Sequence, residues 1–329
     1  MLAGAVTLLL LVSAWLGWQR YQQFLQTPLD IPPGGHVYQL EPGAGGTAVV
    51  AQLEQAGCTR AGWEWKLLMR LEPRIYQAGE YRLEAGLRPA GLLDLLASGQ
   101  VIQYRVTLVE GWTFRELLDA LSRHEVLRHQ LAADDPEALS RLLLALDIAH
   151  PEGWFLPETY QFTRGDSDVD ILTRAHIAMQ RTLEQAWQAR LPDLPLRTPY
   201  ELLTLASIIE KETALDEERG HIAGVFIRRL EKGMRLQTDP TVIYGLGEGY
   251  DGDIRSRDLK TDTPYNTYTR HGLPPTPIAM PGRASLFAAA RPAPGDTLYF
   301  VANGEGGHRF SATLEEHRAA VRKMLEKGQ

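Results

Sequence analysis

Cysteine is nearly absent from this 329-residue sequence, in which Cys58 stands alone. A disulfide framework within the chain and a cysteine-based metal cluster are therefore excluded. A stripe of Lys and Arg with interleaved aromatic residues is also lacking, and the formal net charge is −7, so no concentrated basic face is available for nucleic acid. His271 and His308 lack zinc-ligand spacing and no H-E-x-x-H motif occurs, so the sequence predicts no metal site and no cofactor.

Low-complexity tracts are missing as well, and with 44% hydrophobic and 23% charged residues the chain is expected to fold. Its length fits two or three domains. Alternating stretches typical of strands occur among stretches with helical periodicity, which predicts an α+β protein. We expect an anchor with a juxtamembrane segment over 1–25, a small βα domain over 26–103, and a larger α+β domain over 104–329.

The N-terminal segment carries no charged side chain over residues 1–18. An apolar stretch of about 18 residues is typical of a transmembrane helix, and Trp15 and Trp18 stand where an aromatic belt meets the interface. The alternative is a cleaved signal peptide. It needs small residues at a cleavage site, whereas the chain is bulky from Trp15 to Tyr21, so an uncleaved anchor is favoured.

Beyond a stiff linker over 26–35, one pattern occurs three times: an alternating strand, a turn closed by glycine, and a helix. Each glycine is expected to adopt the left-handed conformation in which a strand turns sharply into a helix. The third helix opens with Thr113 and Glu116 in the spacing of a capping box. The three instances are Val37–Gly43 before Thr47–Ala56, Tyr81–Gly86 before Leu92–Ala97, and Val106–Gly111 before Phe114–Leu121.

A buried helix with an acidic end is predicted after Thr198, the expected N-cap. It is apolar from Leu202 to Ile209 except for two hydroxyl residues, which indicates burial on most sides. Glu210 follows, with small neighbours on its face that leave room for a ligand beside the carboxyl. Glu212 points about 200° away and is expected to pair with Arg219 or Lys211. The simpler interpretation is that Glu210 begins the solvated end of the helix.

Polar loops with aromatic residues lie further along the chain, at Arg235–Thr241, Tyr265–Tyr268 and Gly272–Ile278. Aromatic rings stack on the flat face of a sugar, and amides and hydroxyls bind its hydroxyl groups, so these loops fit a saccharide. Ordinary turn chemistry with core tyrosines explains the same residues equally well. The glycine run Gly304–Gly307 is predicted to be a hairpin turn, and a last helix is expected over Leu314–Leu325.

These residues resemble the MltG/YceG family of endolytic murein transglycosylases, and the resemblance extends from about Val106 to the C-terminus. Upstream, the strand–glycine–helix units resemble the LysM-like module of that family, although they lack its Gly-Asp-Ser/Thr turn. The matching motifs are Ala206–Thr213, Met234–Gly245, Tyr265–Tyr268, Gly272–Pro275, Leu298–Ala302 and Gly306–His308.

The resemblance implies a non-hydrolytic cut between N-acetylmuramic acid and N-acetylglucosamine, with a 1,6-anhydro end as product. Glu210 would be the catalytic acid and then the base. A single carboxyl can act first as the acid and then as the base, whereas a glycoside hydrolase needs a pair of carboxyl groups. The residues implied in substrate binding are Gln237, Thr238, Tyr265, Asn266 and Glu158, with Asp239 as a structural residue.

The resemblance also implies a substrate, partners and a location in the cell. The expected substrate is newly made peptidoglycan glycan strands, whose polymerisation the enzyme would terminate. The expected partners are penicillin-binding protein synthases and the membrane, with the catalytic domain in the periplasm and a single-pass helix in the inner membrane. Two alternatives remain. A lysozyme-like hydrolase would use Asp239 or Glu158 as its second carboxylate, and a non-catalytic wall-binding scaffold of the division machinery would not need Glu210 at all.

Overall fold

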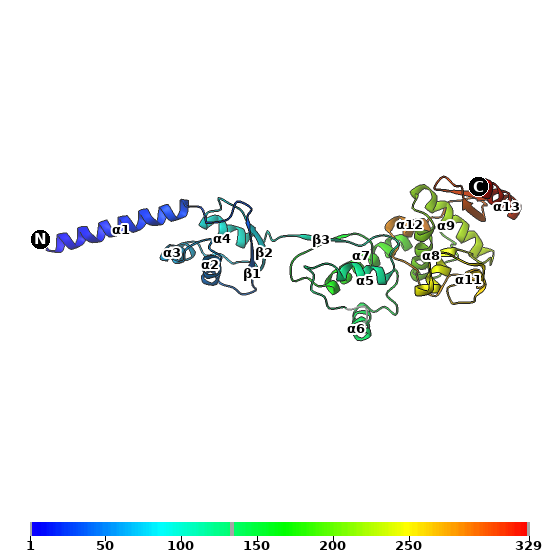
Figure 1. Cartoon of the computed structure of the whole chain (residues 1–329), viewed down its shortest axis with the longest axis horizontal. Helices are drawn as coiled ribbons and strands as arrows, with labels where there is room; N and C mark the ends of the chain where they lie inside the picture. Colours follow the sequence, from blue (N-terminus) through cyan, green and yellow to red (C-terminus); the bar gives the residue numbers. More distant parts are fainter. Residues whose placement is uncertain (1, 132–134, 328–329) are drawn as a thin grey trace. The chain divides into compact units, whose positions relative to one another are not determined.

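The computed structural model describes residues 2–131 and 135–327 and confirms a mixed α+β protein (Figure 1). The chain divides into two compact units. Unit 1 comprises the residues up to Tyr104 together with Gln161–Gly165, and unit 2 comprises Arg105–Tyr160 and the chain from Asp166 onward. The chain passes between them in the paired strands β3 (Tyr104–Thr107) and β4 (Thr159–Phe162).

Unit 1 is built on an antiparallel pair of strands. Its register runs from His36 opposite Leu83 to Leu40 opposite Gly79. The predicted turn glycines Gly43 and Gly86 both have positive φ, as expected. Aromatic and leucine side chains fill the core between strands and helices. The elements are α1 (Leu2–Gln26), β1 (His36–Leu40), α2 (Gly46–Gln55), α3 (Trp63–Leu71), β2 (Gly79–Leu83) and α4 (Pro89–Ser98).

Helix α1 occupies the segment that was predicted to be an anchor, and its last part packs into the core of unit 1. Tyr21 is buried there, and Phe24 and Leu25 pack against the same core. Its first part exposes large apolar side chains, among them Leu8 to Val12. Among the described residues, no helix combines the length and the apolar character needed to cross a bilayer.

Unit 2 surrounds α8 (Pro199–Glu212), whose residues from Leu202 to Ile209 are all buried, as predicted. Thr198 is the N-cap and accepts a hydrogen bond from the backbone N–H of Glu201. The long helix predicted from Asp168 is α7 (Asp168–Gln188). Helices α7, α9 (Asp216–Glu231) and α12 (Arg283–Ala290) pack against α8 and hold it as the central element of the unit.

Unit 2 also contains further short helices and a hairpin. The capping box of α5 forms as predicted between Thr113 and Glu116. The glycine run connects an antiparallel hairpin, with Gly304 and Gly306 at positive φ. The elements are α5 (Phe114–Ser122), α6 (Pro136–Leu146), α10 (Asp239–Leu246), η1 (Gly247–Gly249), α11 (Ser256–Lys260), β5 (Tyr299–Ala302), β6 (His308–Ser311) and α13 (Leu314–Lys327).

Candidate active site

Glu210 lies in the last turn of α8, and its side chain is only 5% exposed. Its Oε2 accepts a hydrogen bond of 2.8 Å from the backbone N–H of Gly282. Its Oε1 lies 3.6 Å from a guanidinium nitrogen of Arg219. Gly282 is the N-cap of α12, where the helix dipole favours a negative charge. Glu210 is therefore a held carboxyl within the protein and not the solvated end of a helix.

A cleft of about 320 Å³ opens beside this carboxyl, and we call it the Glu210 cleft. Gly111 donates a backbone hydrogen bond of 2.9 Å to Met280, and Met280 donates one of 2.7 Å to Trp112. The Nζ of Lys211 donates to the carbonyl of Gly111 at 3.1 Å, which ties this wall to α8. The cleft is lined by Glu110, Gly111, Trp112, Glu116, Glu210, Lys211, Glu212, Thr213 and Ala214.

The backbone conformation explains the glycine in this wall. Gly111 has φ +77°, which favours glycine. A Cβ at this position would lie 4.0 Å from the Cγ of Glu210. The strand–glycine–helix pattern thus brings the chain next to the acidic end of α8.

Glu110 lines the Glu210 cleft as a further carboxyl beside Glu116 and Glu212, and no sequence pattern indicated it. Burial raises the pKa of Glu110, and the charge of Glu210 raises it further, while Arg219 lowers it. The two glutamates are far apart in sequence. They meet because the segment after Glu110 pairs with Met280, two residues before Gly282.

The predicted partner of Glu212 was wrong. Arg219, with its side chain 7% exposed, pairs with Asp216 and Glu210 instead. Lys211 is taken by the Gly111 carbonyl. Glu212 points away from Glu210 as its helical position requires, and it accepts a hydrogen bond from the Thr238 hydroxyl. Burial raises the pKa of Glu212 to about 7, although the Thr238 hydrogen bond lowers it.

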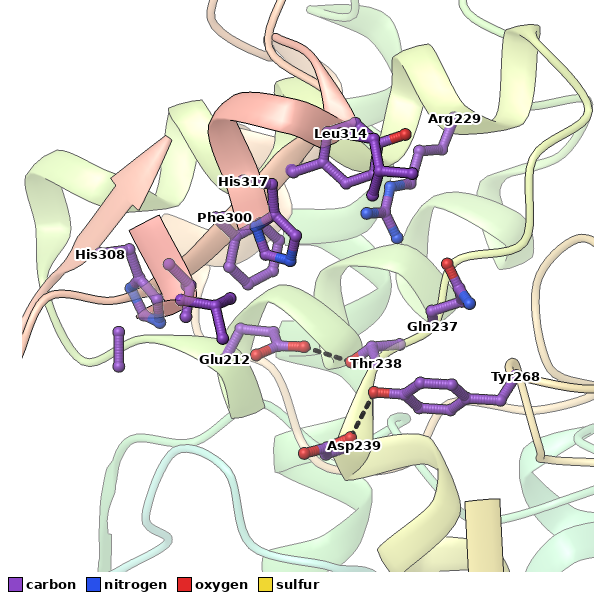
Figure 2. Close-up of a pocket in the computed structure, with 14 residues that line it drawn as sticks. Glu212, Arg229, Gln237, Thr238, Asp239, Tyr268, Phe300, His308, Leu314 and His317 are labelled. Carbon is purple, nitrogen blue, oxygen red and sulfur yellow. Dashed lines mark hydrogen bonds between the residues drawn. The ribbon is translucent and has the colours of Figure 1, made fainter. Parts of the chain in front are cut away.

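A cavity of about 530 Å³ lies where Glu212 points, and we call it the Glu212 cavity (Figure 2). The structure brings the predicted residues Gln237 and Thr238 together there. Gln237 has φ +49°, an uncommon conformation for a residue that is not glycine. Glu212 lines both this cavity and the Glu210 cleft. The other lining residues are Arg229, Asp239, Tyr268, Tyr299, Phe300, Val301, Ala302, His308, Leu314, His317 and Val321.

Asp239 has the structural contact that was expected of it. It is the first residue of α10, and its Oδ1 accepts a hydrogen bond of 2.5 Å from the hydroxyl of Tyr268 (Figure 2). This bond fixes the Tyr268 ring at the edge of the Glu212 cavity. Asp239 does not line the Glu210 cleft, so the structure gives no support to its use as a second carboxylate.

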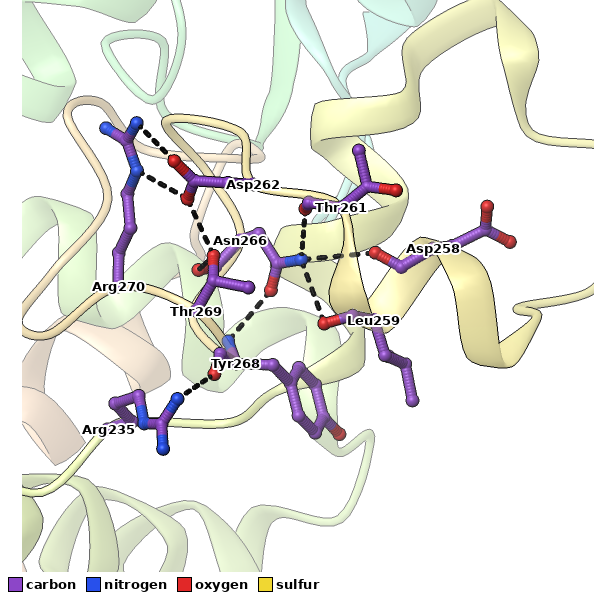
Figure 3. Close-up of polar contacts among 9 residues, drawn as sticks. All are labelled: Arg235, Asp258, Leu259, Thr261, Asp262, Asn266, Tyr268, Thr269 and Arg270. Atoms are coloured by element: carbon purple, nitrogen blue, oxygen red, sulfur yellow. Dashed lines mark hydrogen bonds and ion pairs between the residues drawn. The ribbon is translucent and has the colours of Figure 1, made fainter.

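Asn266 is 1% exposed, and its amide holds a loop together (Figure 3). Its Nδ2 donates to three backbone carbonyls, and its Oδ1 accepts the N–H of Tyr268 at 2.8 Å. The preceding Tyr265 shares a hydrogen bond of 2.9 Å with Thr276 and packs edge-on against Tyr244. The side chains predicted to bind saccharide at these two positions are therefore engaged within the protein. The three carbonyls belong to Asp258, Leu259 and Thr261.

Similarity to known proteins establishes the family of this chain. Residues 38–323 match the YceG-like family. The chain belongs to the YceG-like family. The endolytic murein transglycosylase of Bacillus subtilis (strain 168) is 34% identical over 266 residues, which are 76% of this chain and 73% of that protein.

Other relatives agree with this membership. The endolytic murein transglycosylase of Streptococcus pneumoniae serotype 2 is 28% identical over 91% of this chain, and the chain spans 60% of the length of that protein. A crystal structure of a yceG-like protein from Listeria monocytogenes has a TM-score of 0.57 and 31% identity. That likeness covers 87% of this chain and 98% of the other.

Two acidic residues of this YceG-like chain, Glu158 and Glu152, lie in surroundings that the sequence did not indicate. Glu158, predicted to bind substrate, is exposed just before β4 and lines neither the cleft nor the cavity. Glu152 is buried instead, and it accepts hydrogen bonds from the Phe114 N–H at 2.9 Å and the Tyr244 hydroxyl at 3.0 Å. Burial raises the pKa of Glu152 to about 7. It joins the start of α5, next to the cleft wall, to α10.

Proposed function

We propose that this YceG-like protein is an endolytic murein transglycosylase and that Glu210 is its single catalytic acid and base. One observation carries the proposal. The Glu210 carboxyl is almost fully enclosed, is fixed by the Gly282 N–H, and borders a cleft in unit 2. A carboxyl held in this way has a fixed direction toward a bound sugar, as general acid–base catalysis requires.

The proposed reaction begins with proton transfer from Glu210 to the glycosidic oxygen between muramic acid and glucosamine. The bond from C1 to that oxygen breaks, and positive charge develops at C1. The Glu210 carboxylate, stabilised by the Gly282 N–H and by Arg219, then takes the proton of the C6 hydroxyl. O6 bonds to C1, and the anhydro ring closes. No water is consumed, and Glu210 ends protonated as it began.

Mass spectrometry of digested glycan tests this function. Purified peptidoglycan strands are incubated with the wild type, with Glu210→Gln, and with Glu217→Gln as a matched control. Glu217 is an exposed carboxyl of α9. We expect 1,6-anhydro ends from the wild type and the control and none from Glu210→Gln. Cleavage by Glu210→Gln at the wild-type rate would remove Glu210 from the reaction.

Glu110 gives the hydrolase alternative its specific support, because a second carboxyl in one cleft is what a glycosidase requires. The same spectra separate the two reactions. A hydrolase leaves a reducing end that carries the mass of one added water, whereas the transglycosylase leaves the anhydro end. Reducing ends alone would replace the proposed transglycosylase with a hydrolase, while Glu210 stayed the acid.

A polymer needs more contact than one cleft supplies, and we extend the proposal to the Glu212 cavity. Gln237 and Thr238 line it, and Tyr268 offers an aromatic ring for stacking. Because Glu212 borders both hollows, a strand bound in one can continue into the other. Gln237→Ala is expected to raise KM with little change in kcat, because the residue lies away from Glu210. Steady-state kinetics on purified strands measure both values.

The N-terminal helix is proposed to attach the enzyme to the inner membrane, with unit 2 in the periplasm beside penicillin-binding protein synthases. Its support is the row of exposed apolar side chains on α1, including Leu8 to Val12, Trp15 and Trp18. The LysM-like segment over 26–103 is proposed to contact glycan near the membrane. Removal of residues 2–18 should move the protein from the membrane pellet to the supernatant after ultracentrifugation. Retention of the shortened protein in the pellet would refute attachment through α1.

A further inference from the structure

We propose that Glu110 is a second functional carboxylate of the Glu210 cleft, which faces the reacting sugar and stabilises the positive charge that develops at C1 when the glycosidic bond breaks. This inference rests on the proposed function of Glu210. It adds a residue that neither the family match nor the relatives' names assign.

The placement of Glu110 is the first step. It borders the Glu210 cleft as an exposed residue, whereas the Glu210 side chain is largely covered. Both carboxyls converge on Gly282. The N–H of Gly282 donates to Glu210 at 2.8 Å, and a Cβ added to Gly282 would lie 1.8 Å from Oε1 of Glu110. Glycine at this position therefore leaves the space that the Glu110 carboxylate occupies.

The availability of this carboxylate is the second step. Glu210 is held by a backbone N–H and a guanidinium, and Glu116 caps α5. Glu110 differs from both, because within the described ranges 2–131 and 135–327 no hydrogen bond or ion pair joins a protein group to its carboxyl, and Arg219 acts on it only through its charge. A carboxylate at the cleft surface without a protein donor can bind a ligand directly.

The charge balance gives the third step. Arg219 lies 3.6 Å from Glu210, is itself nearly buried and also pairs with Asp216, so a guanidinium stands beside the proposed acid. Positive charge developing at C1 is repelled by that guanidinium. An ionised Glu110 in the same cleft offsets it. Such fixed charges stabilise a transition state without reorganisation during the reaction.

The protonation of Glu110 supplies a measurable consequence. Burial and the charge of Glu210 raise the pKa of Glu110 above its ordinary range, against the opposing effect of Arg219. Glu116, Lys211 and Glu212 also line the cleft, and the pKa of Glu212 is itself raised to about 7, so the profile of Glu110→Gln is what assigns a rise of kcat with pH to Glu110. Because the proposed role needs the ionised form, kcat should increase as the pH rises through this raised pKa. In Glu110→Gln the side chain carries no charge at any pH, so this increase of kcat with pH should be absent.

Two substitutions separate a charge role from a packing role in the full-length protein. Glu110→Gln keeps the shape and removes the charge, and Glu110→Asp keeps the charge and shortens the side chain. A charge role predicts that kcat on purified strands falls about 100-fold in Glu110→Gln, with KM within about twofold. It also predicts that Glu110→Asp retains more activity than Glu110→Gln. A role limited to packing against Gly282 predicts the opposite, namely that Glu110→Gln retains more activity than Glu110→Asp.

The controls keep this inference distinct from the proposed function. Glu210→Gln and Glu217→Gln are measured in parallel, and circular dichroism checks folding. An inactive Glu210→Gln beside a Glu110→Gln with wild-type kcat and pH profile would overturn the role of Glu110 alone. Wild-type products without anhydro ends would overturn the transglycosylase instead. If Glu110→Gln does not fold, the proposal is tested by the kcat of Glu110→Asp and by the pH profile of the wild type. A wild-type kcat that does not change with pH on the acid side would refute the proposal.

Discussion

Replacing Ser207 by alanine tests how firmly the site is attached to the core of unit 2. Ser207 is fully buried in the middle of α8, one turn before Glu210. Its Oγ donates to the carbonyl of Thr204 at 2.7 Å and accepts the N–H of Ile278 at 3.0 Å. Ile278 begins the segment that leads through Met280 to Gly282, so this hydroxyl connects α8 to the loop that holds Glu210.

The magnitude follows from what alanine leaves behind. A buried N–H at Ile278 without its acceptor costs about 1–3 kcal/mol, and the methyl group of alanine restores none of it. For a unit of this size, a loss of about 2 kcal/mol lowers Tm by about 4–8 °C. Activity should also fall, because the Gly282 N–H becomes less firmly placed beside Glu210.

Calorimetry of the full chain measures the unit 2 transition, and hydrogen exchange measures the amide of Ile278 directly. Ser122→Ala is the matched control, since Ser122 is exposed and bonds within its own helix. Faster exchange at Ile278 together with a lower Tm would support the reasoning. A Tm within about 1 °C of the wild type, with unchanged exchange, would show that the Ser207 hydroxyl does not hold this loop.

Three other residues of unit 2, namely Asn266, Gly282 and Glu152, have contacts whose loss should be measurable. Asn266→Ala should destabilise unit 2 by about 2–4 kcal/mol in urea unfolding, because several hydrogen bonds are lost at once, and a wild-type stability with raised KM would restore Asn266 as a saccharide ligand. Gly282→Ala should lower kcat by about tenfold, since its Cβ displaces the Glu110 carboxylate, and full activity would show that Glu110 moves aside without consequence. Glu152 has a pKa of about 7, above its value in the unfolded chain, so its protonated form is favoured by folding and stability falls as pH rises from about 4.5 toward 7. Glu152→Gln should make that decline in Tm with pH less steep without removing it, because Glu212 has a similarly raised pKa, and an unchanged slope would assign the decline to other groups.

Local signals predicted local structure well. The Thr113 and Glu116 capping box, the N-cap at Thr198 and the left-handed glycines each depend on residues within one turn, so the sequence contains all that is needed. The buried character of α8 was predicted because apolar residues on every face leave no alternative to burial. The position of Glu210 on that helix followed directly.

Contacts between distant segments were not predictable in the same way. Glu110 reaches Glu210 through backbone pairing with Met280, and backbone pairing carries no side-chain signature. The partner of Glu212 was missed because charge complementarity suggested Arg219, whereas a neutral hydroxyl from another loop lies where the helix directs the side chain. The loop contacts of Asn266 were not foreseen, because an amide near aromatic rings is equally suited to sugars and to loop carbonyls.

The order in which the ribosome produces the chain gives these long-range contacts a further meaning. Glu210 meets Gly282 across 72 positions, and Lys211 meets Gly111 across 100. A nascent polypeptide that already contains Glu210 therefore still lacks the segment that holds its carboxyl. Closing such large loops slows folding, so this cleft is expected to mature late. A growing chain can therefore complete this cleft only after Gly282 has been synthesised.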